Sequence, residues 1–407
     1  MLLSDVANLL FASLLITGLY LVIKFINMPN QIAQKRNHSR SGLIKVLSWC
    51  GLISFGLLWV VALMVVLMPY DDSLKRIVKN LKKHPVSMIF HTVVIGIFVF
   101  STFGVMQFVI PPQQTVDATL LEEASYQEAK LLGRIENDTI VEASGISRSH
   151  RRDDLFWVHN DSNNEELLYA VGLDGEDMGS FRIDGVTMND WEAMASYEID
   201  DIPYIVIADV GDNEGGRQYY NLYGVVEPEV VPGQGETNID LAWHMRFQYE
   251  DGPRNCESMA IDETSNEILF ISKYDVPHRL YSIPLPEVSS EVTDDLVEAK
   301  FVTEITTVPQ PDIFETITHY PKGVNNGKTT SFDISADGKK AIVLTYTNAY
   351  IYERDVNEDW SNAFSRLPKK VAIPVRSEAA GFLNDNQTFF IIPEHGDVPL
   401  YRFDAMN

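Results

Sequence analysis

Glu142-Ala-Ser-Gly-Ile-Ser147 is followed, after a polar turn, by Leu155-Phe-Trp-Val-His-Asn-Asp161. The first segment is a run of small residues led by an acid. The second is a strongly apolar run that ends in polar residues. Short runs of this kind, bounded by turn residues, are typical of two antiparallel β-strands joined by a hairpin. Whether the unit recurs along the chain therefore decides between a lone hairpin and a repeat architecture.

The same unit returns four times further along the chain. The acids that lead the five units are Glu142, Glu192, Glu257, Asp333 and Glu378. A third apolar run follows in every unit, and a fourth follows in four of them, at Met178–Ile183, Leu241–Tyr249, Ala299–Ile305 and Lys370–Pro374. Four antiparallel strands per repeat are typical of a propeller blade. We therefore predict an all-β propeller over residues 128–407, with five four-stranded blades.

The two ends of this region are expected to meet. The last unit stops at Asn407 without an outer strand, and Leu131–Ile135 can supply one, which would close the ring and remove an exposed sheet edge. Six blades are the alternative, with an extra blade led by Glu315. Glu315 lies only 18 residues before Asp333, too few for four strands.

Charge divides the chain into two parts. Residues 1–110 contain ten Lys/Arg and three Asp residues, a net of +7, so residues 111–407 carry the −32 that brings the whole chain to −25. A domain this acidic repels nucleic acid and gathers cations. We therefore expect no nucleic-acid partner.

The basic part, residues 1–110, has the pattern of a membrane anchor. Three apolar runs, Val6–Ile26, Leu47–Met68 and Val86–Ile110, are each long enough to cross a hydrocarbon core of ~30 Å. We predict a three-helix transmembrane anchor over residues 1–110 and a linker over residues 111–127, which begins with Pro111-Pro112.

The orientation of the anchor depends on the third run, because both connecting loops are basic. Five Lys/Arg precede Val86–Ile110, and the segment Pro111–Tyr126 that follows has none and contains three acids. The positive-inside rule then predicts a multi-pass protein of the cell (inner) membrane with the propeller on the extracytoplasmic side. The basic first loop leaves the reverse topology open.

Strand direction predicts where a site lies. In a blade the first strand starts on the face where the second strand ends, so the five lead acids and the residues that follow the second strands should share one mouth of the central channel. Polar residues expected there as ligand-binding residues are Asn160, Asp161, Asp190, Asp209, Asp212 and Asn213.

Five carboxylates around one axis favour a bound cation, since like charges raise one another's pKa and destabilise the fold. Ca²⁺ accepts six to eight oxygen ligands in flexible geometry, which fits Glu142, Glu192, Glu257, Asp333 and Glu378 as metal ligands. Zn²⁺ fits less well, because this face has no Cys and only His159 and His395. The alternative is that these acids only form structural hydrogen bonds between blades.

Several motifs carry a family resemblance. The strings EASGIS, FWVHNDS, LYAVGLDG, NDWEAMA, ADVGDN, DGPRNCESMAID and FDISADGKKA resemble a widespread, largely uncharacterised bacterial β-propeller family in content and order, over about residues 140–390. The chain departs from that pattern at Ala193-Met194, where the family has Asp-Ile, and in its three apolar runs. The repeated lead acids are also similar in layout to the calcium-activated nucleotidases. That likeness implies five blades with a central Ca²⁺.

Three functions follow from these observations. The first is a membrane-anchored propeller that holds Ca²⁺ at the channel mouth and binds a small-molecule or protein ligand there. The second is a metal-dependent hydrolase of phosphoester or lactone type, in which His159 or His395 would transfer the proton. The third is an interaction scaffold without a metal.

Overall fold

The computed structural model describes residues 23–34, 41–50, 115–231, 233, 235–286, 296–319, 322–393 and 398–406. Contacts within the chain divide it into two units, Met1–Val109 and Ile110–Asn407. The two units are treated separately below.

In the first unit the described residues are helical. Residues 23–34 form one helix, and α2 spans Ser41–Cys50. Ala33 and Ile44 pack together between them and are fully buried. No helix among the described residues is long and apolar enough to cross a membrane. The run Val86–Ile110 and most of the other two apolar runs lie outside those residues, so the anchor stays a prediction.

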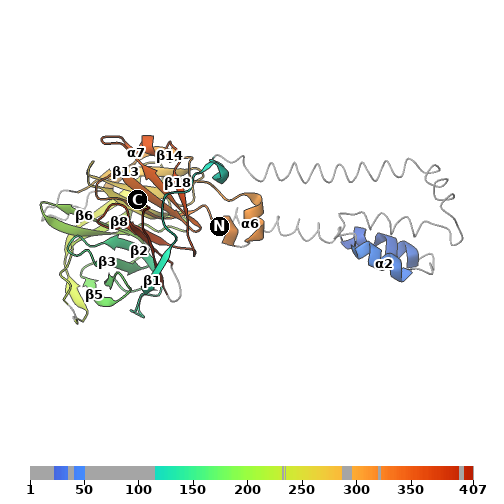
Figure 1. Ribbon diagram of the computed structural model, residues 1–407, viewed down its shortest axis with the longest axis horizontal. Helices are drawn as coiled ribbons and strands as arrows, with labels where there is room; N and C mark the ends of the chain where they lie inside the picture. Colours follow the sequence, from blue (N-terminus) through green and yellow to red (C-terminus); the bar gives the residue numbers. More distant parts are fainter. Residues whose placement is uncertain are drawn as a thin grey trace. The chain divides into compact units, whose positions relative to one another are not determined.

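The described strands of the second unit form five four-stranded units, which we call blades 1 to 5. Figure 1 labels at least one strand of each blade. Blade 1 contains β2 (Ala143–Arg148), β3 (Leu155–Asn160), β4 (Leu167–Gly172) and β5 (Asp177–Ile183). Blade 2 contains β6 (Trp191–Ile199), β7 (Ile202–Asp209), β8 (Tyr220–Val226) and β10 (Leu241–Tyr249). Blade 3 contains β11 (Cys256–Asp262), β12 (Glu267–Ser272), β13 (His278–Pro284) and β14 (Leu296–Ile305). Blade 4 contains β15 (Thr329–Ile334), β16 (Lys340–Thr345), β17 (Asn348–Glu353) and β18 (Lys369–Ala372). Blade 5 contains β19 (Ala379–Phe382), β20 (Phe389–Ile392), β21 (Pro399–Phe403) and β1 (Lys130–Arg134).

The innermost strands form a ring. They contact one another in the cyclic order β2, β6, β11, β15, β19 and back to β2. The outer strand of blade 5 comes from the start of the domain, because β1 pairs antiparallel with β21. The expectation of an all-β, propeller-like fold closed by the segment around Leu131–Ile135 is thus confirmed for the described residues.

Two parallel pairings add to this pattern. β10 pairs with β14, which joins blades 2 and 3 into one eight-stranded sheet, and the short strand β9 (Thr237–Ile239) pairs with β5. The gap between β14 and β15 contains the helix α6 (Ile313–Thr318) and the 3-10 helix η2 (Lys322–Asn325). Glu315 lies in α6, so it does not lead a sixth blade.

The segment expected as a linker over residues 111–127 packs on the second unit from Thr115 onward. It contains the 3-10 helix η1 (Ala118–Leu120), and bridges join Glu123 to Lys370 and Tyr126 to Ala405. Leu121 is buried in an apolar cluster with Val308. Leu121 thus packs against blades 3 and 4, and Ala124 and Tyr126 pack against blades 4 and 5.

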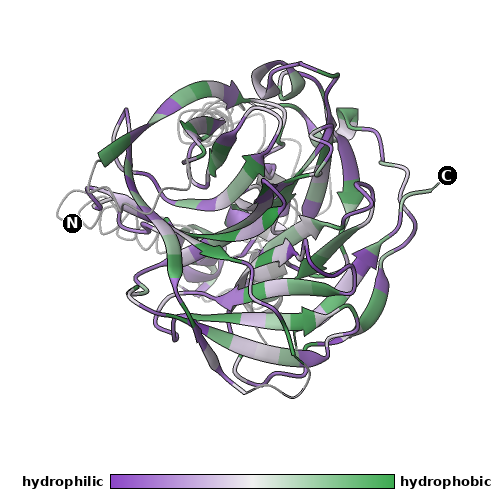
Figure 2. Ribbon diagram, turned by 90° about the vertical axis from the view of Figure 1, so that its left-hand side faces the viewer, coloured by the Kyte–Doolittle hydropathy of each residue, from purple (hydrophilic) through white to green (hydrophobic). Residues whose placement is uncertain are grey.

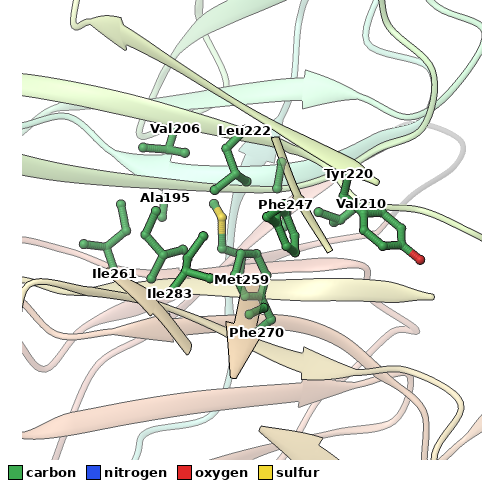
Figure 3. Close-up of a cluster of buried hydrophobic side chains, with 14 of the residues drawn as sticks. Ala195, Val206, Val210, Tyr220, Leu222, Phe247, Met259, Ile261, Phe270 and Ile283 are labelled. Atoms are coloured by element: carbon green, nitrogen blue, oxygen red, sulfur yellow. The ribbon is translucent and has the colours of Figure 1, made fainter. Parts of the chain in front are cut away.

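Blades pack face to face through apolar side chains. Figure 2 shows hydrophobic residues concentrated along the strands and hydrophilic residues in many of the connecting loops. Between blades 2 and 3, Val206 and Leu222 meet Met259, Phe270 and Ile283 in one cluster (Figure 3). Burial of whole side chains like these stabilises a fold by about 1.5–3 kcal/mol each, and it fixes the strand register on which the site depends.

Candidate metal centre

A bulge near the start of four of the five inner strands sets the geometry of the channel mouth. The pairing register shifts by one residue at Ser144, Glu192, Glu257 and Thr330. Glu378 occupies the same place in blade 5, because its N–H bonds Ile392, the residue that pairs with Ala379. We call these five places the bulge position. Bulges re-aim a side chain out of the ladder, and they are common beside functional sites.

This register corrects two of the five predicted ligand positions. Glu192, Glu257 and Glu378 are at the bulge position, but Glu142 lies two residues before it and accepts a hydrogen bond from Asn164 at 2.9 Å. Asp333 lies three residues beyond it, because β15 already begins at Thr329.

Asp333 belongs to the other end of the inner strands. Its Oδ2 accepts a hydrogen bond from the Phe382 N–H at 2.7 Å, and burial raises its pKa against the effect of nearby Arg148. Arg148 in turn pairs with Glu263, in the turn after β11, at 3.2 Å. The equivalent bulge residue of blade 4 is Thr330, whose hydroxyl donates to the Ser377 carbonyl.

Three carboxylates gather beside the bulge of blade 2. Asp161 follows β3, Asp190 precedes β6, and Glu192 is at the bulge position of β6. One oxygen from each lies within 4.8 Å of the other two. We call these three residues the acid cluster. All three residues of the acid cluster are predicted from the sequence, Asp161 and Asp190 as ligand-binding residues and Glu192 as a metal ligand.

The acid cluster is an electrostatically costly arrangement. Glu192 is only 4% exposed. Burial and the carboxylates of Asp161 and Asp190 hold its pKa well above the usual value. Burial also raises the pKa of Asp190, with Asp209 adding to the effect. Among the described residues Glu192 has no ion pair, and its Oε2 accepts one hydrogen bond, from Ser144 at 3.2 Å.

Gly211 provides room beside these carboxylates. A Cβ at this position would lie 2.2 Å from Asp190 Oδ2 and 2.8 Å from Glu192 Oε1. Any side chain would thus fill the space into which both acids point. The glycine in Val210-Gly-Asp212 is explained by this close approach.

Glu257 and Glu378 have different surroundings. Glu257 forms an ion pair with Lys273, and both side chains are more than nine-tenths buried. Glu257 is therefore neutralised within the protein, which departs from its predicted role as a metal ligand. Glu378 is 9% exposed, and its charge contributes to the raised pKa of Glu192.

The remaining predicted ligand-binding residues organise the loops. Asn160 accepts hydrogen bonds from the Val141 and Glu142 amides, at 3.0 and 3.1 Å. Asp209 pairs with Arg217 at 2.8 Å and accepts from the Asp190 N–H at 3.1 Å, which positions that member of the acid cluster.

Asp212 and Asn213 hold the loop that follows β7. Burial acts to raise the pKa of Asp212, but hydrogen bonds from the Gly216 and Arg217 amides outweigh it and lower the pKa. The Asn213 side chain accepts from the Tyr274 hydroxyl at 2.5 Å.

His159, one of the two histidines predicted as the proton-transfer residue, is not exposed at the mouth. His159 is fully buried, its Nδ1 lies 2.8 Å from the Asn160 carbonyl oxygen, and burial lowers its pKa to about 4. Its Nε2 has no hydrogen-bond partner among the described residues, and a Cβ on Gly145 would lie 2.3 Å from it. It packs edge-on against Trp191. His395 lies outside the described residues.

Sequence reasoning missed the cationic side of the mouth. The residues two places before the bulge position, which we call the pre-bulge position, are Glu142, Asp190, Asn255, Lys328 and Arg376. Two acids, one amide and two cations therefore follow one another around the ring. This order of charges is contained in the sequence, but it becomes visible only when the five inner strands are aligned by their bulges.

Neither a protein-family model nor a curated protein matches this sequence. Among solved structures, similar chains include a gluconolactonase from Xanthomonas campestris, which is 10% identical. The match covers 73% of this chain and 96% of the gluconolactonase, with a TM-score of 0.36. A likeness this low carries no argument about activity, and the resemblance based on motifs stays a prediction.

Proposed function

We propose that this protein is a membrane-anchored, extracytoplasmic propeller that binds Ca²⁺ at its channel mouth and uses the loaded mouth to bind a ligand. The observation that carries the proposal is the acid cluster, in which the buried Glu192 faces two further carboxylates. Removing several negative charges from water costs free energy unless a cation neutralises them. The anchor and its orientation rest on the apolar runs and on the charges that flank them.

The donor set fits a hard divalent cation. Ca²⁺ binds oxygen at ~2.3–2.6 Å, so two ligands on opposite sides of one ion lie up to ~5 Å apart. The oxygens of Asp161, Asp190 and Glu192 fall within 4.8 Å of one another, so one ion can reach all three. Gly211 leaves the neighbouring space open for water or ligand oxygens. When bound, the cation would neutralise the acids and offer open coordination positions to a ligand.

A metal-dependent hydrolase is the second candidate, and the space beside Gly211, which lies next to oxygens of Asp190 and Glu192, favours it. A cation held there would polarise a substrate oxygen and activate a water. His159, one of the two predicted proton-transfer residues, is buried away from solvent. Release of product from phosphate esters or lactones that requires Ca²⁺ and is lost in Glu192→Gln would support this candidate.

Glu192→Gln is expected to separate a cation site from structural acids. In chelator the variant should be more stable than wild type, by on the order of 1–3 kcal/mol, because a buried charge without an ion pair has gone. In the wild type a hundredfold excess of Ca²⁺ over the dissociation constant should add ~2.7 kcal/mol. In the variant this gain should be largely lost. Thermal unfolding of the full chain with chelator, Ca²⁺ or Mg²⁺ measures both effects.

The pH dependence provides an internal check. A carboxyl whose pKa is raised on folding destabilises the folded state most when the pH is above that raised pKa. The destabilisation disappears as the pH falls to the usual pKa of 4.5. The advantage of Glu192→Gln in chelator should therefore grow as the pH rises above 4.5 and disappear as the pH falls to that value. Glu198→Gln, at the exposed far end of the same strand, is the matched control and should keep the full Ca²⁺ response. A wild type that ignores Ca²⁺, with Glu192→Gln simply destabilised, would make these acids structural.

A further inference from the structure

The charges around the mouth are segregated. At the pre-bulge position, blades 1 and 2 carry Glu142 and Asp190, blade 3 carries Asn255, and blades 4 and 5 carry Lys328 and Arg376. The acid cluster lies on the first side of this ring. The second side has the opposite sign, although the domain as a whole is strongly acidic.

Two tyrosine rings hold the cations of this side together. Lys328 Nζ lies 4.3 Å from the centre of the Tyr274 ring, and the Arg376 guanidinium carbon lies 4.2 Å from that of Tyr346. Lys273 Nζ lies within reach of both rings, at 6.0 and 5.5 Å. These five residues, which we call the cationic cluster, come from the loops of blades 3, 4 and 5 at the same end of the strands.

The cationic cluster carries excess positive charge. Glu257 neutralises Lys273, but within the part of the chain that the structure describes neither Lys328 nor Arg376 forms an ion pair. Both are partly buried. Burial and the charge of Lys273 lower the pKa of Lys328, and burial lowers that of Arg376. Cations in this situation gain from an anionic partner. Among the described residues the Glu378 carboxylate, two residues after Arg376, acts on the Arg376 charge without forming an ion pair with it.

We propose that the cationic cluster is the binding site for the phosphate group of a phosphorylated ligand. Arg376 Nη1 already donates to Asn326 Oδ1 at 2.6 Å, which orients the guanidinium and leaves its other N–H groups for phosphate oxygens. Lys328 supplies a point charge. Two cations beyond the Lys273–Glu257 pair match a dianion better than a singly charged carboxylate. The assignment deepens the proposed function, since the ligand would span the cationic cluster and the cation at the acid cluster. Phosphate binding itself does not need that cation.

Inorganic phosphate is the probe that tests this site. Calorimetric titration of the full chain in chelator should show phosphate binding, with sulfate weaker and acetate weaker still. Lys328→Gln and Arg376→Gln should each reduce the affinity for phosphate roughly 10- to 100-fold, the effect of losing one charge-assisted hydrogen bond. Lys339→Gln removes an exposed lysine from the hairpin turn of blade 4 and should bind phosphate like wild type.

The outcomes separate the two proposals. Phosphate binding that is lost in both variants supports the site even if Ca²⁺ does not bind, in which case the cation proposal alone fails. Equal affinity in wild type, Lys328→Gln and Arg376→Gln would overturn the phosphate site, and so would acetate binding as tightly as phosphate. Circular dichroism of each variant shows whether it is folded. If the glutamine variants unfold, Lys328→Met takes their place, because it keeps the length of the side chain without the charge; it should lower phosphate affinity as Lys328→Gln would, and unchanged affinity would overturn the site.

Discussion

Lys273→Met should destabilise the fold by about 3–5 kcal/mol, because it leaves the Glu257 carboxylate buried without its partner. The side chains of Lys273 and Glu257 are 8% and 6% exposed, so water cannot replace the lost ion pair. Urea unfolding of the full chain, followed by the fluorescence of buried tryptophans such as Trp191 and Trp243, measures the change.

The double variant Lys273→Met/Glu257→Leu tests the cause. Replacing both partners of a buried pair by apolar groups is often nearly neutral, so most of the lost stability should return. Lys300→Met is the matched control, because Lys300 pairs with Glu298 at the surface and is 61% exposed. Loss of this surface ion pair should change the free energy of unfolding by less than ~1 kcal/mol. A Lys273→Met protein as stable as wild type would show that Glu257 is not held as an ion.

Deletion of residues 128–136 should remove the cooperative unfolding transition of the second unit. The deletion takes away β1, which pairs with β21 and joins the start of the domain to its end. β21 would then present a row of unpaired N–H and C=O groups, a template for association with other chains. We expect a broad, low-amplitude thermal transition and concentration-dependent aggregation in light scattering.

A peripheral strand provides the control for this deletion. β9 lies outside the four-stranded pattern, and among the strands that the structure describes it pairs only with the outer strand β5. Replacing Thr237–Ile239 by Gly-Ser-Gly should leave one sharp transition, lowered by a few degrees at most. If the deletion of residues 128–136 behaves like this replacement, the ring does not depend on closure by β1.

The strands were more accessible to sequence reasoning than the site. The expected outer strand Leu241–Tyr249 matches β10 residue for residue, because alternating or continuous apolar runs bounded by turn residues are local signals. The acid cluster was also accessible in part, since Asp161, Asp190 and Glu192 all lie where strand direction places the mouth. Closure by the segment around Leu131 followed from the missing outer strand of the last unit.

The site predictions that the structure corrects depended on strand register and on pairing between side chains. The acid of the string FDISADG was aligned with the other lead acids, although the bulge residue of that blade is Thr330 and Asp333 lies further along the strand. The neutralisation of Glu257 by Lys273 could not be seen either, because it requires knowing which side chain faces which. Nothing in the sequence marks Lys328 and Arg376, because only the strand register shows that they share the mouth with the carboxylates.

The central claim is that one cation binds at the acid cluster, and diffraction from crystals of the full chain grown with Ca²⁺ tests it most directly. Replacing Ca²⁺ by a heavier ion of similar chemistry, such as Tb³⁺, gives an anomalous signal that locates the ion. We predict one strong peak coordinated by oxygens of Asp161, Asp190 and Glu192, at ~2.3–2.6 Å in the Ca²⁺ form. A saturated crystal with no peak beside Glu192, or with the ion bound only by surface carboxylates elsewhere, would contradict the account.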